Sequence, residues 1–394
     1  MATLTTLPSD VRPLPTTLPL DEEGLRHYEE RYGVHYRQWS EILTENAARL
    51  ARGSYSLHWM DTDGAAWGKR AKPSSRGLTY TDTNRLPAYG TPPEEATWKS
   101  FAPRGSVREP YKHRMPVIED YTVTACNELW ADNVITLYEE AKARQWNATR
   151  DIPWTELEAL PEDLEKATCQ LYTFLTEVEF VAGDFPAKWM ARTPQDFLEV
   201  KSFLSTQIMD EARHQEVFRK RAIAGGGLLH SSPGFEWALS AILDAPTHTM
   251  GTYLLNLLAE GLVLSVFRSG EMIAKTHVDK EIFRRALQDE ARHVSYGVLQ
   301  LQYHLDHVQD RAAEVETFHR FADVGEMVVL TAFTEAALVE PLAILLGGGL
   351  DKIDAGMDGM KHVWTMLVEE YLARCDRAGF PRRERCRIPV QAPW

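Results

Sequence analysis

The pentapeptide Asp210-Glu211-Ala212-Arg213-His214 recurs unchanged further along the chain as Asp289-Glu290-Ala291-Arg292-His293. Both copies lie in stretches whose apolar residues follow a helical period. In each copy glutamate and histidine are three positions apart, so a helix places both on one face, where they can share a metal ion. One such pair is common on solvated helices. Two identical pairs inside apolar patterns predict equivalent metal sites that face each other across a helical bundle.

The sequence around the two copies, about 163–308, has the pattern of a duplicated helical hairpin. Its first turn, Thr193-Pro194-Gln195-Asp196, offers an N-cap, a proline for the first helical position and an acid three positions after the cap. A turn of the same kind is expected near Thr276–Asp279. A hairpin folded at Pro194 places Glu177 beside Glu211, because the two are equally far from that proline along the chain. Folding near Lys275 pairs Glu260 with Glu290 for the same reason.

Two lone carboxylates are therefore expected to join the two repeated pairs. Glu260 lies within the apolar run 254–263, where an isolated charge is costly unless partners or a metal neutralise it. In the first helix Glu177 and Glu179 compete, and periodicity alone does not separate them. Four carboxylates balance two divalent cations, and an oxygen-rich set with two imidazoles suits iron or manganese better than zinc.

These residues resemble the ferritin-like di-iron carboxylate superfamily, whose bundle uses two lone glutamates and two Glu-x-x-His pairs. The repeated Asp-Glu-x-Arg-His form is most similar to the hydroxylase subunits of bacterial multicomponent monooxygenases, followed by the acyl-carrier desaturases. The resemblance implies an all-α, ferritin-like four-helix bundle with additional helices and a long irregular N-terminal segment. In this family an apolar residue often follows the first ligand by four positions. Val181 does so for Glu177, which favours Glu177 over Glu179.

The resemblance implies two iron ions (Fe2+/Fe3+), or an Fe/Mn pair, held by six side chains: Glu177, Glu211, His214, Glu260, Glu290 and His293. It also implies that Asp210 holds the imidazole of His293 and that Asp289 holds that of His214, because a metal-bound imidazole needs its other N–H fixed. Arg213 and Arg292 would then neutralise these aspartates at the surface of the site.

Departures from related families narrow the chemistry. The ribonucleotide reductase small subunit has its radical tyrosine where this chain has Phe218, and its first ligand is usually aspartate. The arylamine N-oxygenases have a third histidine where this chain has Ala286. The multicomponent hydroxylases usually place threonine four positions after the lone glutamate of the third helix. This chain has Leu264 there, with Ser265 beside it, so their proton relay is not carried over.

The expected function is that of an O2-dependent di-iron oxidoreductase, an oxygenase that acts on a small or medium organic substrate. Glu260 would be the catalytic ligand that shifts its binding mode. The alternatives are a ferroxidase or peroxide-scavenging iron protein, a di-iron desaturase, and a scaffold whose metal only stabilises it. Residues one helical turn from the ligands are expected to form a buried apolar substrate pocket: Phe180, Val181, Phe218, Leu257 and Leu264.

Composition limits the partners. The chain has 394 residues, and its net charge of −14 argues against non-specific nucleic-acid binding. We find no run of about 18 apolar residues, and the N-terminus lacks the pattern of a secretory signal. Four scattered cysteines fit a cytoplasmic protein and exclude a Cys-x-x-Cys cluster. No dinucleotide fingerprint is present, so electrons would come from a separate reductase or ferredoxin. A second copy of the chain, as a homodimer, is a further candidate partner.

The organisation along the chain is predicted as two parts, 1–120 and 121–394. The first part comprises an amphipathic helix over about Asp21–Arg52, followed by ordered coil over 53–116 that wraps on the core. The second part is the helical domain that contains the bundle. The two Gly-Gly-Gly runs, which begin at Gly225 and Gly347, are interpreted as helix stops rather than phosphate loops.

Overall fold

The computed structural model describes residues 36–55, 57, 60, 70–75, 77–85, 92–96, 104, 121–231 and 233–394. The chain divides into two compact units, 1–67 with 107–118, and 68–106 with 119–394. The first unit contributes helix α2 (Tyr36–Ala51), which coincides with the second half of the helix expected over Asp21–Arg52. The first half of that helix, and most of the coil expected over 53–116, fall outside the described residues. Residues 68–106 belong to the second unit, whereas the sequence predicts them in the N-terminal part.

The described residues of the second unit form helices and no strand, with two isolated bridges, Ser74–Gly77 and Glu95–Ala125. The prediction of an all-α fold is confirmed. The elements are α3 (Tyr80–Asn84), η2 (Cys126–Glu128), α4 (Val134–Ala143), η3 (Trp154–Glu156), α5 (Glu162–Met190), η4 (Gln195–Phe197), α6 (Leu198–Gly225), α7 (Pro233–Leu243), α8 (His248–Thr252), the π-helical segment η5 (Tyr253–Ala259), α9 (Glu260–Arg268), α10 (Gly270–Ile273), α11 (His277–His307), α12 (Arg311–Phe333), α13 (Ala336–Gly347), η6 (Leu350–Lys352) and α14 (Ile353–Ala378).

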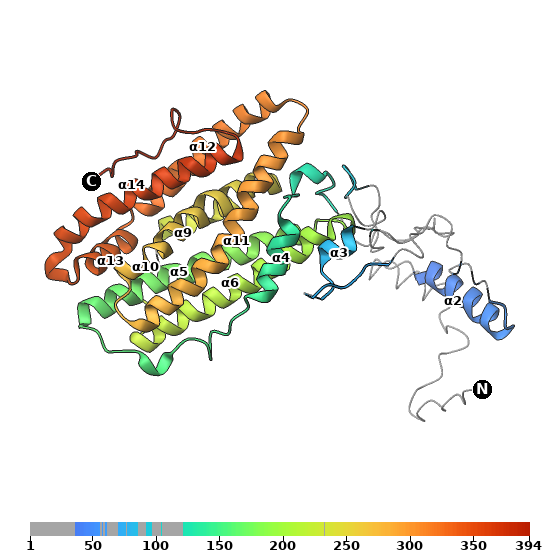
Figure 1. The fold of residues 1–394 in the computed structure, drawn as a ribbon, viewed down its shortest axis with the longest axis horizontal. Helices are drawn as coiled ribbons and strands as arrows, with labels where there is room; N and C mark the ends of the chain where they lie inside the picture. Colours follow the sequence, from blue (N-terminus) through green and yellow to red (C-terminus); the bar gives the residue numbers. More distant parts are fainter. Residues whose placement is uncertain are drawn as a thin grey trace. The chain divides into compact units, whose positions relative to one another are not determined.

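Four long helical segments build the bundle (Figure 1). The first hairpin is α5 and α6. The second pairs a continuous segment, made of α8, η5 and α9, with α11. The duplicated pentapeptides therefore lie on α6 and α11, the second helix of each hairpin, as the sequence predicts.

Local sequence signals fix several helix ends. The side chain of Thr276 caps α11 by accepting a hydrogen bond from the backbone N–H of Asp279. The turn before α6 differs, because Pro194 leads into the 3-10 turn η4 before the helix begins at Leu198. Both triple-glycine runs end helices: α6 stops at Gly225, and α13 stops at Gly347, with Gly348 in the left-handed region at φ +82°.

Additional helices cover the bundle. Helix α13 packs on α5 and α14, and α14 also packs on α9, so the third bundle segment is covered on its outer side (Figure 1). The segment His248–Arg268 is long and apolar enough to cross a membrane by length and composition, and 89% of its most apolar window is buried inside the protein. The bent pair Arg311–Thr331 and Ala336–Gly347 passes the same test jointly. The position of His248–Arg268 in the core accounts for its apolar composition.

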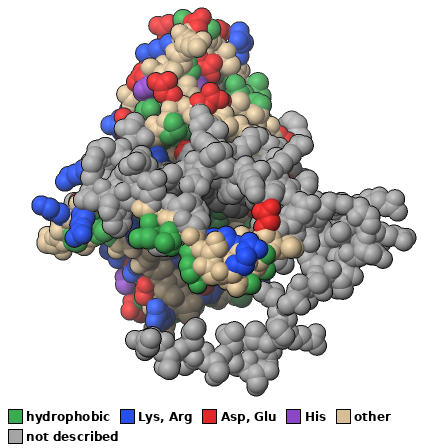
Figure 2. Space-filling view, turned by 90° about the vertical axis from the view of Figure 1, so that its right-hand side faces the viewer, with side chains coloured by type: hydrophobic (Ala, Val, Ile, Leu, Met, Phe, Trp, Pro, Cys, Tyr) green, Lys and Arg blue, Asp and Glu red, His purple; other side chains and the backbone are tan. Residues whose placement is uncertain are grey.

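The surface in Figure 2 mixes acidic, basic and apolar side chains over the described residues of that face. Such interspersed charge is ordinary for a globular protein, since apolar atoms make up much of any protein surface. The polar chemistry that sets this chain apart lies instead inside the bundle.

Candidate metal centre

Six buried side chains converge in the middle of the bundle, three from each hairpin. Their ligand atoms form two groups, each within 4.8 Å: Glu179, Glu211, His214 and Glu290 in one, and Glu211, Glu260, Glu290 and His293 in the other. Glu211 and Glu290 belong to both groups. The arrangement is therefore two adjoining half-sites, each with its own histidine and lone glutamate, joined by two shared carboxylates.

The distances are those of atoms arranged around common centres. His214 Nδ1 lies 3.3 Å from Glu211 Oε2, 3.2 Å from Glu290 Oε1 and 3.9 Å from Glu179 Oε2. His293 Nδ1 lies 2.8 Å from Glu211 Oε1, 3.5 Å from Glu290 Oε2 and 3.8 Å from Glu260 Oε1. Each imidazole thus points the same nitrogen at the carboxylates of its own half-site.

Many of these atoms lack a hydrogen-bond partner although they are buried. The unpartnered atoms are Glu179 Oε1, both oxygens of Glu211, Glu290 Oε2 and the Nδ1 atoms of His214 and His293. Buried polar atoms are normally paired, because each one left unpaired costs about 1–3 kcal/mol. Six orphaned atoms aimed at one place are explained by ions that they would coordinate. The residues therefore fit a pair of divalent cations.

Charge leads to the same conclusion. Two carboxylates about 4 Å apart repel by about 4 kcal/mol even at the moderate effective dielectric of protein sites. Burial and the charge of Glu211 raise the pKa of Glu179 well above its usual value, and burial raises the pKa of Glu260 despite the opposing effect of His293. The four carboxylates thus need protons or cations to coexist, and two divalent ions would neutralise them.

The outer nitrogen of each imidazole contacts an aspartate from the opposite helix. His293 Nε2 is 3.3 Å from Asp210 Oδ2 on α6, and His214 Nε2 is 3.2 Å from Asp289 Oδ2 on α11. These are the crossed contacts that the family resemblance implies. An aspartate here fixes the tautomer and orientation of the ring, so that Nδ1 remains available to an ion.

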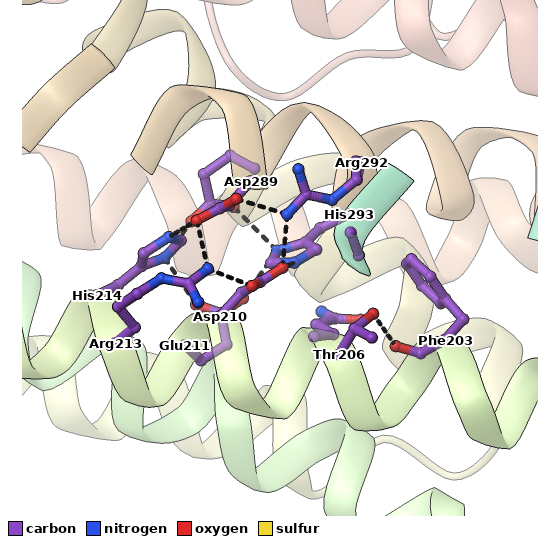
Figure 3. A network of polar contacts seen from close by, with 12 residues as sticks. Phe203, Thr206, Asp210, Glu211, Arg213, His214, Asp289, Arg292 and His293 are labelled. Carbon is purple, nitrogen blue, oxygen red and sulfur yellow. Dashed lines mark hydrogen bonds and ion pairs between the residues drawn. The ribbon is translucent and has the colours of Figure 1, made fainter. Parts of the chain in front are cut away.

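Arg213 and Arg292 close a ring with the two aspartates (Figure 3). Each guanidinium contacts the aspartate of its own helix and reaches across to the other, at 2.8 Å from Asp289 Oδ2 and from Asp210 Oδ2 respectively. Both arginines contact the two aspartates, as the resemblance implies, and their side chains are buried, at only 3% exposed. The ring has no net charge and ties α6 to α11 beside both histidines.

Trp146, in the segment after α4, joins this ring on one side only. Its Nε1 donates to Asp289 Oδ2 at 2.7 Å, and its ring stacks on His214 with a centroid distance of 6.4 Å. Gln145 next to it accepts from Arg213 Nη1 at 2.8 Å. No periodic pattern predicted the roles of Gln145 and Trp146, because both lie in an irregular segment that is far in sequence from the two pentapeptides.

The sequence-based choice of Glu177 is wrong, since the structure brings Glu179 to the centre. Glu179 is 3% exposed. Glu177 is half-buried on another face, where burial and the charge of Glu236 raise its pKa. The reason is the 3-10 turn η4, which moves the midpoint of the hairpin from Pro194 to Gln195, the position from which Glu179 and Glu211 are equally far along the chain.

The expected substrate pocket also needs correction. Phe180 and Val181 were placed one turn after Glu177, but Phe180 is 57% exposed and Val181 is only half-buried. Phe218 packs beside His214 at a centroid distance of 6.1 Å, and Leu257 and Leu264 are buried. None of these five residues lines the apolar cavity that borders α5 and α9.

That cavity lies between α5, α7, the η5–α9 segment and α12. The space within it, counted with the open solvent at its mouth, is about 540 Å³, of which about 50 Å³ admits the centre of a water-sized molecule, and its lining residues are all apolar. Two of them, Val178 and Ala259, are the chain neighbours of Glu179 and Glu260. The walls of the cavity thus include the chain neighbours of both lone glutamates.

Two buried carboxamides next to Glu260 were not foreseen. Gln207 Nε2 donates to Glu260 Oε1 at 3.1 Å, and Asn256 Nδ2 donates to Glu260 Oε2 at 2.7 Å. Both could have been found from spacing, because Gln207 precedes Glu211 by four positions and Asn256 precedes Glu260 by four. Ser265, by contrast, donates hydrogen bonds to Glu370 of α14 and to the carbonyl of Gly261, and not to a residue of the centre.

Comparisons with known proteins give a likeness to solved structures alone. No protein-family model and no curated protein matches the chain. The R2-like ligand-binding oxidase with aerobically reconstituted Mn/Fe cofactor is similar with TM-score 0.49 and 18% identity, over 64% of this chain and 95% of that one. A mutant of that oxidase with anaerobically reconstituted Mn/Fe cofactor has TM-score 0.48 and 20% identity, over 63% and 94%.

The assignment of the site rests on this chain's own residues. Lone glutamates from α5 and α9, with Glu-x-x-His pairs from α6 and α11, reproduce the plan of ferritin-like dimetal carboxylate proteins. The resemblance drawn from the sequence is in this respect confirmed.

Proposed function

We propose that this protein is an O2-dependent dimetal oxidoreductase, and specifically an oxygenase that acts on an uncharged organic substrate. The observation that supports the proposal is the set of six buried atoms at the centre of the bundle, four carboxylate oxygens and two imidazole nitrogens, that have no hydrogen-bond partner. Four carboxylates and two imidazoles form an oxygen-rich set suited to iron or manganese, either as two iron ions or as an Fe/Mn pair. When bound, such ions would supply the oxidation chemistry with O2.

The protein's own residues would provide orientation. Asp210 and Asp289 hold the imidazoles by their Nε2 atoms, and Arg213 and Arg292 hold the aspartates. The ring restricts rotation of both histidines and keeps net charge away from the outer side of the site. Phe218 covers His214 with an apolar surface that excludes water.

The apolar cavity would bind the substrate. Because its walls offer no charged or hydrogen-bonding side chain, it suits an uncharged aliphatic or aromatic group. Val178 and Ala259 connect it, by chain adjacency, to the two lone glutamates. Electrons would come from a separate donor such as a reductase or a ferredoxin.

Oxygen consumption tests this function. The full chain is loaded with iron, reduced without air, and mixed with O2 in the presence of uncharged probes such as toluene, indole and medium-chain alcohols. We expect at least one class of probe to accelerate O2 uptake and to yield an oxidised product. Uptake that no probe changes, together with release of ferric iron, would instead support a ferroxidase.

Two variants of α12 connect the result with the cavity. Val329 lines the cavity, whereas Val324 on the same helix is 62% exposed. Val329→Trp should fill the cavity and abolish the acceleration by the probe, while Val324→Trp keeps it. Equal acceleration in both variants would show that the substrate binds elsewhere.

A further inference from the structure

Glu260 differs from the other three carboxylates of the centre in its partners. Both of its oxygens accept a hydrogen bond from a buried carboxamide, one from Gln207 and one from Asn256. The other three glutamates each keep at least one buried oxygen without a hydrogen-bond partner. The two half-sites are therefore not equivalent, although each hairpin contains one copy of the same pentapeptide.

The backbone brings Asn256 to Glu260. Asn256 lies in the π-helical segment η5, and the backbone N–H of Glu260 bonds to the carbonyl of Leu255, five positions back. Such widened turns are rare and frequently occur at functional sites. Here the turn ends at the residue that enters the centre, with the carboxamide of Asn256 against its carboxylate.

Gly297 on α11 makes room for Asn256. A Cβ atom at this glycine would lie 2.4 Å from the Cβ of Asn256, which is far inside van der Waals contact. Gly297 follows His293 by four positions and so lies on the same face of α11. The helix that supplies His293 thus approaches η5 closely where the carboxamide is held.

Gln207 completes the arrangement from a third helix. It lies on α6, one turn before Glu211, and is 1% exposed. Each carboxylate oxygen has two lone pairs, so it can accept an amide N–H and still coordinate an ion. The two carboxamides therefore fix the plane of Glu260 without occupying its ligand positions.

We propose that Gln207 and Asn256 are positioning residues that clamp Glu260 and make the His293 half of the centre the preorganised, tighter metal site. This inference rests on the dimetal centre proposed above. The His214 half lacks such a clamp, because Oε1 of Glu179 has no hydrogen-bond partner. Its ion binds second and more weakly.

Anaerobic titration of the metal-free full chain with Co2+ tests the clamp, with the ligand-field absorption as readout. Wild-type protein should bind two ions in two steps. His293→Ala should remove the tighter step and His214→Ala the weaker one. Asn256→Leu and Gln207→Met should each weaken the tighter step by roughly 10–100-fold, the usual effect of losing a partner of a ligand. The weaker step should change by less than about 3-fold.

Gln300→Met is the matched control. Gln300 is a fully buried carboxamide of α11 that contacts Asn127 and Thr249, and its loss should leave both steps unchanged. Helical circular dichroism checks that each variant folds, and Gln207→Met carries the test alone if Asn256→Leu does not fold. Two unchanged steps in a folded clamp variant would overturn the inference but leave the centre intact. Failure of the wild-type chain to bind Co2+ would overturn the centre itself.

Discussion

The two hairpins carry the same pentapeptide but present their lone glutamates by different means. Helix α5 is regular through Glu179, whereas the third bundle segment widens into η5 immediately before Glu260. Glu260 is clamped by two carboxamides, and Glu179 is not. On the other side, Trp146 supports Asp289 and stacks on His214, while Asp210 has no such neighbour among the described residues.

This difference shows that a repeated motif fixes the ligands but not their surroundings. The pentapeptide determines which atoms meet at the centre. The segments around it, which are not repeated, determine how firmly each half holds an ion. The predictions that follow test this distinction, beginning with the residues common to both halves.

The largest effect is expected at the shared carboxylates. Glu211→Ala or Glu290→Ala removes a ligand from both half-sites at once, and the chain should lose at least one of its two ions. Metal analysis of protein purified from the same iron- and manganese-supplemented medium measures the loss. Retention of two ions in either variant would show that these glutamates are not shared.

Substitution of either lone glutamate should remove the ion from one half-site only. Glu179→Ala should empty the His214 half and Glu260→Ala the His293 half, so that one ion remains in each variant. Glu177→Ala is the control for α5: it should keep both ions, because Glu177 lies outside the cluster of candidate ligands. An empty centre in Glu177→Ala would restore the sequence-based choice.

That choice marks where sequence reasoning reached its limit. Identical spacing and apolar context were enough to predict the two Glu-x-x-His pairs, Glu260 and the helical bundle from the sequence. The sequence could not decide between Glu177 and Glu179. A shift of the hairpin midpoint by one residue changes the residue that lies opposite Glu211 by two positions. The backbone of η4 decides that shift, and no residue pattern reports it. The prediction that Phe180 and Val181 line the pocket was wrong for the same reason, since both were placed relative to Glu177.

The crossed aspartates should have a smaller, selective effect. Asp210→Asn should weaken the His293 half and Asp289→Asn the His214 half, each by roughly 10–100-fold. Asparagine keeps the shape, whereas alanine would also leave a void and take from buried Arg213 and Arg292 one of the two aspartates that each contacts, which destabilises the fold. Stepwise Co2+ titration distinguishes the halves. Weakening of the half on the same helix as the variant would contradict the crossed arrangement.

The smallest effect is expected for His248, the first residue of the third bundle segment. Burial lowers the pKa of this imidazole to about 4, although its Nδ1 lies 2.8 Å from the carbonyl of Glu128. The unfolded chain takes up a proton below about pH 6.5 and the folded chain does not, so this contribution to stability falls as pH falls from about 6.5 towards 4. When the pH falls from 7.5 to 5.5, the free energy of unfolding, measured by urea denaturation, should fall by about 1 kcal/mol more in the wild-type protein than in His248→Gln. Equal losses would mean that His248 is charged in the folded protein.

The central claim is that two ions share Glu211 and Glu290 at the middle of the bundle. Anomalous diffraction from crystals of the metal-loaded chain, recorded at the iron, manganese and zinc edges, tests it most directly. The account predicts two iron or manganese peaks, one beside His214 and Glu179 and one beside His293 and Glu260. A single zinc peak with four tetrahedral ligands would contradict it.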